Sequence, residues 1–63
     1  MSAFEQRLRA ALAEAYTAEG VETVMRSRLM LGGCIGTWQE YLANGEGDLV
    51  LDWAESLTGM VAT

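Results

Sequence analysis

Apolar residues recur every three or four positions at the start of the chain, which predicts an amphipathic helix. The residues of this apolar face are Phe4, Leu8, Ala11, Leu12 and Ala15. Ser2 and Glu5 have the spacing of a capping box, in which each side chain binds the other residue's exposed backbone N–H. Gly20 is the expected end, because glycine accepts the left-handed conformation of a C-terminal cap. We therefore expect a first helix that begins at Ser2 and stops at Gly20.

A second apolar stripe runs through residues 22–43 and is the strongest periodic pattern in the chain. Its members are Val24, Leu31, Ile35, Trp38 and Leu42, joined by Cys34 and Tyr41. Gly32 and Gly33 interrupt it, and each interior glycine costs a helix roughly 0.5–1 kcal/mol relative to alanine. The stripe keeps its phase across the pair, since Leu31 and Ile35 are four positions apart. The pattern favours one long central helix, straight or kinked at the glycines, over two shorter helices.

A third helix is predicted from near Asp48, a good N-cap residue, to about Leu57 or Thr58. We expect Gly59 to close this helix and residues 60–63 to form a frayed tail or a short hydrophobic clasp. The expected apolar face consists of Leu49, Val50, Trp53 and Leu57.

Together these segments predict an all-α fold, a small three-helix domain spanning residues 1–63, in which the Asn44-Gly45 pair ends the long central helix. Gly32 and Gly36 stand four positions apart in apolar surroundings, a pattern that permits close helix–helix packing. The partner helix belongs either to another molecule or to the protein's own first or third helix.

The length of 63 residues limits the chain to one domain with a marginal core, because such a chain buries only about 60% of its unfolded surface. Small domains often compensate with a disulfide, a metal or oligomerisation. Cys34 is the only cysteine, and the chain has no histidine for a zinc site. The hydrophobic content of 51% argues against disorder. We therefore expect a homodimer or docking on a larger partner.

Charge is segregated along the chain, whose net value is −5. The four basic residues all lie in the first half: Arg7, Arg9, Arg26 and Arg28. The charged residues that follow are all acidic: Glu40, Glu46, Asp48, Asp52 and Glu55. Such a chain is repelled by nucleic-acid phosphates, which also argues against a helix-turn-helix DNA reader. The acidic half favours a basic surface on a protein partner, or else only keeps the protein in solution.

The sequence offers little for catalysis or for a cofactor. Without histidine, the commonest general base is missing. Cys34 has no candidate base and reads as a small buried hydrophobe. We expect no enzyme activity and no cofactor.

One stretch follows the ligand spacing of an EF-hand calcium loop. Its oxygen-bearing residues are Asn44, Glu46, Asp48, Asp52 and Glu55. Leu49 stands where the sharp turn of that loop requires glycine, and Asn44 replaces the usual aspartate. A calcium-binding helical hairpin therefore stays a remote alternative.

The aromatic residues of the second half are candidates for binding, because tryptophan is enriched at interface hot spots. The alternative is that they form the core of so small a protein. The predicted protein-binding residues are Trp38, Tyr41, Asp48, Asp52, Trp53 and Glu55.

The expected location is cytoplasmic, since no signal peptide is evident and a lone thiol suits a reducing compartment. The longest weakly polar run, residues 29–38, is shorter than the roughly 20 residues of a membrane helix. These features predict a small acidic protein-interaction module that regulates or inhibits a larger protein. Host-directed phage proteins, including anti-CRISPR-type inhibitors, are similar in size and charge, although no motif is shared. The alternative is a small structural subunit or assembly factor of a larger complex.

Overall fold

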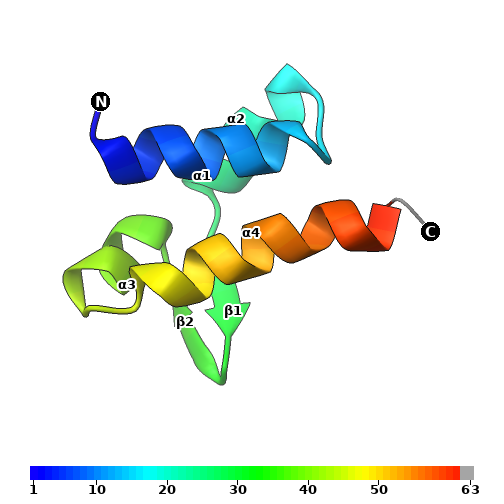
Figure 1. Cartoon of the computed structure of the whole chain (residues 1–63). Helices are drawn as coiled ribbons and strands as arrows, with labels where there is room; N and C mark the ends of the chain where they lie inside the picture. Colours follow the sequence, from blue (N-terminus) through cyan, green and yellow to red (C-terminus); the bar gives the residue numbers. More distant parts are fainter. Residues whose placement is uncertain (62–63) are drawn as a thin grey trace.

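The computed structural model describes the backbone of residues 1–61 and the side chains of residues 1–58. Within these residues the elements are α1 (Ala3–Ala13), α2 (Ala18–Arg26), β1 (Leu29–Leu31), β2 (Cys34–Gly36), α3 (Trp38–Ala43) and α4 (Gly47–Val61) (Figure 1). The prediction of a small, mainly helical domain is confirmed. The prediction of three helices without strands is wrong, because the described residues form four helices and a hairpin.

Helix α1 begins as expected after Ser2, whose hydroxyl accepts the Glu5 backbone N–H at 3.1 Å. The predicted capping box forms only in this half, since the Glu5 carboxylate accepts a hydrogen bond from Arg9 and none from the Ser2 N–H. The helix ends earlier than predicted, at Ala13. The Thr17 hydroxyl accepts the Gly20 N–H at 3.2 Å and starts α2, so Gly20 lies inside the second helix. The break between the first two helices is therefore set by the N-cap Thr17 and not by Gly20.

The predicted long central helix is wrong, because Gly32 and Gly33 form the turn of an antiparallel hairpin. Their φ angles are 60° and 84°, both in the left-handed region. The register pairs Leu31 with Cys34 and leaves these glycines as a two-residue loop. Two successive positive φ angles are what a type I′ hairpin turn needs, and glycine adopts them readily. Gly32 therefore lies in a turn and Gly36 in β2, so the predicted helix-packing role is wrong for both.

Helix α3 is capped at both ends by local hydrogen bonds. The Thr37 hydroxyl accepts the Glu40 N–H at 3.2 Å, and the Glu40 carboxylate accepts the Thr37 N–H at 2.8 Å, which completes a capping box. Asn44 is the C-cap and Gly45 has φ 76°, so the predicted helix end at this pair is confirmed.

Helix α4 begins at Gly47, one residue before Asp48, and continues through Gly59 to Val61. The prediction that Gly59 ends the helix is therefore wrong. Met60 and Val61 are helical, and the rest of the predicted tail, residues 62–63, lies outside the described residues. The expected apolar face also needs correction, since Leu49 is 39% exposed while Leu51 and Ala54 are buried beside Val50.

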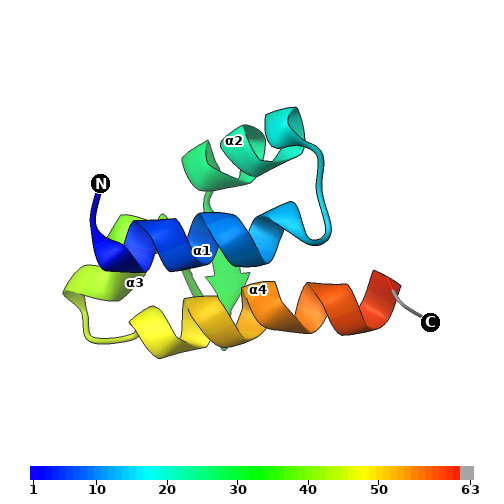
Figure 2. The same ribbon diagram turned by 45° about the horizontal axis from the view of Figure 1, so that its top comes forward.

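Helices α1 and α4 run side by side in the same direction (Figures 1 and 2). The hairpin packs on α4 through β1 and, in the view of Figure 1, extends past α4. The core lies between these elements and consists of Leu8, Leu12, Val21, Met25, Leu29, Trp38, Tyr41, Val50, Leu51 and Ala54. A close approach of α1 to the start of α4 depends on Gly47, where a Cβ would lie 2.8 Å from Phe4 Cε2. Among the described helices, none combines the length and apolarity needed to cross a membrane.

Candidate interaction surfaces

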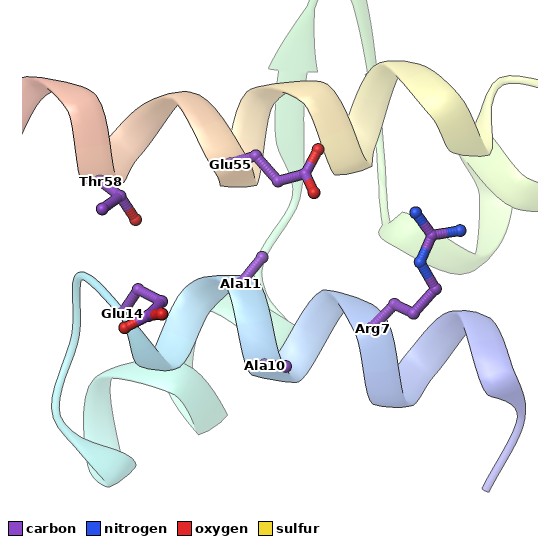
Figure 3. A pocket seen from close by; sticks show the side chains of 6 residues that line it. All are labelled: Arg7, Ala10, Ala11, Glu14, Glu55 and Thr58. Carbon is purple, nitrogen blue, oxygen red and sulfur yellow. The ribbon is translucent and has the colours of Figure 1, made fainter.

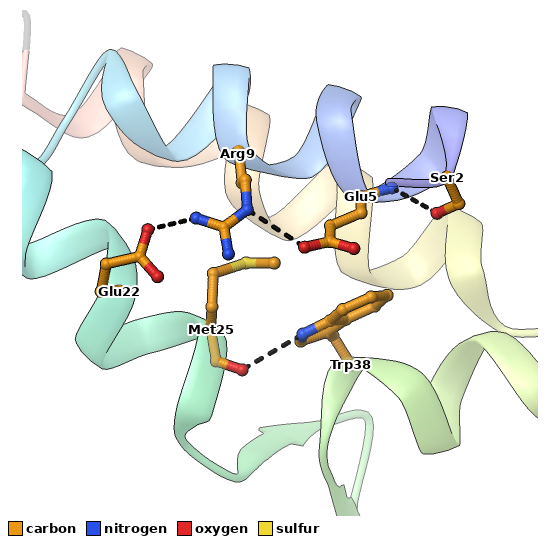
Figure 4. A network of polar contacts seen from close by, with 6 residues as sticks. All are labelled: Ser2, Glu5, Arg9, Glu22, Met25 and Trp38. Carbon is orange, nitrogen blue, oxygen red and sulfur yellow. Dashed lines mark hydrogen bonds and ion pairs between the residues drawn. The ribbon is translucent and has the colours of Figure 1, made fainter.

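Trp38, predicted to bind a partner, lies in the core and is only 8% exposed. Its indole N–H donates to the Met25 carbonyl at 3.1 Å, and its ring stacks on Phe4 with 5.9 Å between centroids (Figure 4). Trp38 thus connects the start of α3 to the end of α2 by a hydrogen bond and to α1 by ring stacking. Its surface is already covered by the protein itself.

Tyr41 is 4% exposed and organises the hairpin. Its hydroxyl donates to the Cys34 carbonyl at 2.6 Å and accepts the Leu31 N–H at 3.0 Å. One side chain from α3 therefore binds the backbone of both strands, next to the turn. A small two-stranded sheet is marginal alone in water, and this clamp supplies support from outside the sheet.

The acidic part of the predicted binding set is exposed, unlike Trp38 and Tyr41. Asp48, Asp52 and Glu55 are exposed along α4 at intervals of four and three residues, and Glu55 faces the groove between α1 and α4. Trp53 lies on the same helix and is half-buried against the core. The structure therefore separates the predicted set into an exposed acidic row and aromatic rings that serve packing.

The calcium alternative fails on geometry, because the stretch that resembles an EF-hand loop is mostly helix. Asp48, Asp52 and Glu55 belong to α4, so they do not encircle a common point as loop ligands do. Within residues 1–58, whose side chains are described, no group of three or more acidic or cysteine side chains is placed to hold a metal ion.

The hairpin has an exposed apolar pair that the sequence analysis missed. Met30 and Ile35 are cross-strand neighbours and are 71% and 63% exposed. We call this pair the outer face of the hairpin; Leu29 and Leu31, which pack on the core, form the inner face. The available signal was the Gly-Gly dipeptide between two short apolar runs, which is typical of a tight hairpin.

A cleft of about 60 Å³ adjoins the outer face, between β2 and the segment from α3 to α4. Its lining residues are Cys34, Ile35, Gly36, Glu40, Tyr41, Asn44 and Glu46. The Cys34 thiol is exposed, so its prediction as a buried hydrophobe is wrong: the hairpin turn carries it away from the core. The charged side chains of this lining, Glu40 and Glu46, are both acidic.

Glu40 is held in its ionised form. Its pKa is lowered chiefly by the hydrogen bond from the Thr37 backbone N–H, then by the Thr37 hydroxyl, and further by the positive charge of Arg28. The carboxylate beside the outer face therefore keeps its charge at neutral pH and below its ordinary pKa.

A second, larger hollow of about 360 Å³ lies between α1 and α4 (Figure 3). It is lined by Arg7, Ala10, Ala11, Glu14, Glu55 and Thr58. The two alanines form the α1 side of this groove, with Arg7 toward one end and Glu14 toward the other (Figure 3). Within the described side chains, Arg7 makes no ion pair, whereas Arg9 on the other side of the helix is fully engaged.

Arg9 links α1 to α2 through Glu22 and also binds Glu5 at 3.2 Å (Figure 4). The hydrogen bond to Glu22, followed by that to Glu5, raises the pKa of Arg9 further above its ordinary value. The same contact lowers the pKa of Glu22. These charges satisfy one another within the chain. Arg7, Arg26 and Arg28 are exposed and make no ion pair among the described side chains.

No family model, curated protein or solved structure shows a significant match to this chain.

Proposed function

We propose that this protein is a small acidic interaction module that docks on a larger protein, as a regulator or inhibitor, through the outer face of its hairpin. The main observation behind the proposal is the exposed cross-strand pair Met30–Ile35, on a hairpin whose inner face packs on the core. Burying one such side chain fully contributes about 1.5–3 kcal/mol, so leaving two in water forgoes a large gain for a domain of this size.

The hairpin suits binding because it is already ordered in the free protein. Tyr41 holds both strands, and the positive φ angles at Gly32 and Gly33 fit the turn without strain. A rigid surface loses little conformational entropy on association. Met30 adds adaptability, since unbranched methionine can fit irregular partner surfaces.

The surroundings of the outer face favour a partner that presents an apolar side chain flanked by lysine or arginine. Glu40 and Glu46 line the cleft next to Ile35, and every charged residue after Arg28 is acidic. Asp48 and Asp52, exposed on α4, add to the same negative field. Complementary charge accelerates encounter and orients the partner.

A free-standing regulator fits this fold better than an obligate subunit does. The described core is closed, and no buried side-chain nitrogen or oxygen atom within it lacks a hydrogen-bond partner. Subunits that fold only in a complex leave large apolar faces open, whereas among the side chains of residues 1–58 the most exposed large apolar ones in the helices and strands are Met30 and Ile35, followed by Leu42 and Leu49 at 39%.

The test compares what different surface variants retain from a native lysate. Tagged wild type, Met30→Asp/Ile35→Asp and Tyr16→Asp would be used as baits, followed by quantitative mass spectrometry. Tyr16 is the matched control, because it is an exposed apolar residue in the connection between α1 and α2, away from the hairpin. We expect proteins that wild type and the Tyr16 variant both retain to be depleted about tenfold or more by the hairpin variant.

Equal retention by all three baits contradicts the proposal, provided that circular dichroism shows the same helical content. The exposed Cys34 thiol offers a second readout, because it lines the same cleft as Ile35 and a thiol-linked photocrosslinker placed there can reach a molecule bound at that cleft. A crosslink to a protein that the hairpin variant fails to retain identifies the partner directly.

A further inference from the structure

The groove between α1 and α4 carries a charge pattern that is complementary to itself. Along α1 its lining residues are Arg7, Ala10, Ala11 and Glu14, a positive end, two alanines and a negative end. A two-fold axis through the midpoint of Ala10 and Ala11 exchanges Arg7 with Glu14. A second α1 laid antiparallel across this point would therefore place each Arg7 opposite a Glu14 and alanine opposite alanine.

We propose that a second copy of this chain occupies the groove, with the two α1 helices antiparallel about a two-fold axis at Ala10–Ala11. Isologous contacts of this kind use the same surface patch on both copies, so every favourable pair occurs twice. The alanines allow the helix backbones to approach closely, since no long side chain stands between them. The inference does not depend on the proposed function of the hairpin, because no residue of β1 or β2 lines the groove.

Arg7 is available for such a contact. It is exposed, and within the described side chains it makes no ion pair. Glu55 reaches into the same groove from α4, where it lies between the ends marked by Arg7 and Glu14 (Figure 3). Each groove thus holds one cation and two carboxylates, so the assembled pair keeps an acidic excess. We therefore expect a reversible dimer that weakens when its two Arg7–Glu14 pairs are screened by salt.

The size of the contact also indicates reversible association. Helix α1 has 11 residues and is about 16 Å long. The area that one face of this helix and the groove wall bury on each copy is less than the roughly 800 Å² per partner of a standard stable interface. We expect dissociation constants in the range of about 10–500 μM, within reach of sedimentation equilibrium and of chemical-shift titration.

The experiment is a charge exchange across the proposed axis. Wild type, Arg7→Glu, Glu14→Arg and the double exchange Arg7→Glu/Glu14→Arg would be compared by sedimentation equilibrium over about 10 μM to 1 mM, at low salt. Either single reversal replaces two attractive pairs by two repulsive ones, so we expect dimerisation to weaken tenfold or more. The double exchange restores opposite charges and should recover dimerisation to within about threefold of wild type.

A mixture of the two single variants gives the sharpest test. The Arg7→Glu chain has glutamate at both positions and the Glu14→Arg chain has arginine at both, so the two should form a heterodimer although neither pairs with itself. Arg26→Glu is the control, since it makes the same change of net charge at an exposed position on α2 and should leave association unchanged. Circular dichroism checks that every variant keeps its helical content.

A wild-type chain that stays monomeric to 1 mM overturns the proposal. The proposal is also overturned if both single reversals leave the dimer affinity unchanged, or if the double exchange dimerises no more tightly than the single variants. Met30→Asp/Ile35→Asp separates this interface from the hairpin: it should leave self-association intact, and dimer loss in that variant places the contact on the hairpin instead.

Discussion

The two faces of one short hairpin have opposite surroundings. On the inner face, Leu29 is buried, Leu31 is half-buried, and the Tyr41 hydroxyl binds the backbone of both strands. On the outer face, Met30 and Ile35 are mostly in water. Alternation along a strand turns successive side chains to opposite sides, so neighbours in sequence have different surroundings.

The contrast shows how a very small domain divides its residues between folding and recognition. The inner face, with the help of Tyr41, fixes the hairpin on the core. The outer face contributes nothing to that packing and is free to contact another molecule. Substitutions on the inner face should therefore lower the free energy of unfolding, whereas substitutions on the outer face should weaken partner binding.

The largest effect is expected for Leu29→Ala, on the inner face. Leu29 belongs to the core, and truncating a buried leucine removes contacts and leaves a cavity. We expect the free energy of unfolding to fall by about 2–4 kcal/mol, measured by urea denaturation. A loss below about 1 kcal/mol would show that the hairpin does not complete the core.

Tyr41→Phe should come next, since it removes only the hydroxyl that binds the two strands. The Cys34 carbonyl and the Leu31 N–H each lose a partner in a part-buried place. We expect a loss of about 1–2 kcal/mol. Hydrogen exchange offers the finer test, because the Leu31 amide should lose protection more than amides in α1.

Gly33→Ala tests the turn that joins the two faces. Its φ of 84° disfavours any side chain, while an added Cβ would meet no atom within 4 Å, so the cost is conformational alone. We expect about 1–2 kcal/mol of destabilisation for alanine and less for Gly33→Asn, since asparagine tolerates this region better. Stabilisation by alanine would instead favour a helix through this segment.

A smaller, pH-dependent effect should come from Glu40, whose carboxylate caps α3 beneath the hairpin. Its pKa in the folded protein is lowered by the bonds from Thr37, so the stabilisation is present above the ordinary carboxyl pKa. It should disappear as the pH falls from that value through the lower pKa of the folded state. Melting temperatures recorded between about pH 6 and pH 3 should therefore fall less steeply in Glu40→Gln than in wild type.

The smallest effect on stability is expected on the outer face, where Met30→Ala and Ile35→Thr should each change the free energy of unfolding by less than about 0.5 kcal/mol. The same variants should weaken partner retention, because the lost apolar area is the proposed contact. A large loss of stability in Met30→Ala would mean that the outer face is covered in the folded protein and would contradict the division of the hairpin into a packing face and a binding face.

The sequence predicts several helix boundaries of this fold but not the hairpin between them. The Ser2 cap, the stop at Asn44-Gly45 and the start of α4 follow from local chemistry, and each is confirmed to within about one residue. The four-residue spacing of Leu31 and Ile35 resembles that of a helix only by chance, because the hairpin places these two residues on opposite faces. Strands of three residues are too short to show alternation, so the Gly-Gly turn was the only local sign.

The candidate surfaces divide in a similar way. The carboxylates Asp48, Asp52 and Glu55 were predicted to be exposed and are exposed, since ionised groups avoid the core. Trp38 and Tyr41 are amphipathic, and whether such rings lie in a core or at an interface depends on which backbone groups reach them. Here the Met25 and Cys34 carbonyls do so from other elements, which periodicity cannot reveal.

The pairing of α1 with α4 imposes an order on events during synthesis. Leu8 and Leu12 share a core with Val50 and Ala54, so the apolar side of the first helix has no complete docking site until the last helix has been translated. At about 5–20 residues per second, that interval is roughly 2–8 s. For this time the nascent chain presents leucines that the finished molecule conceals, and a chaperone that recognises α1 would have a window that closes when α4 arrives.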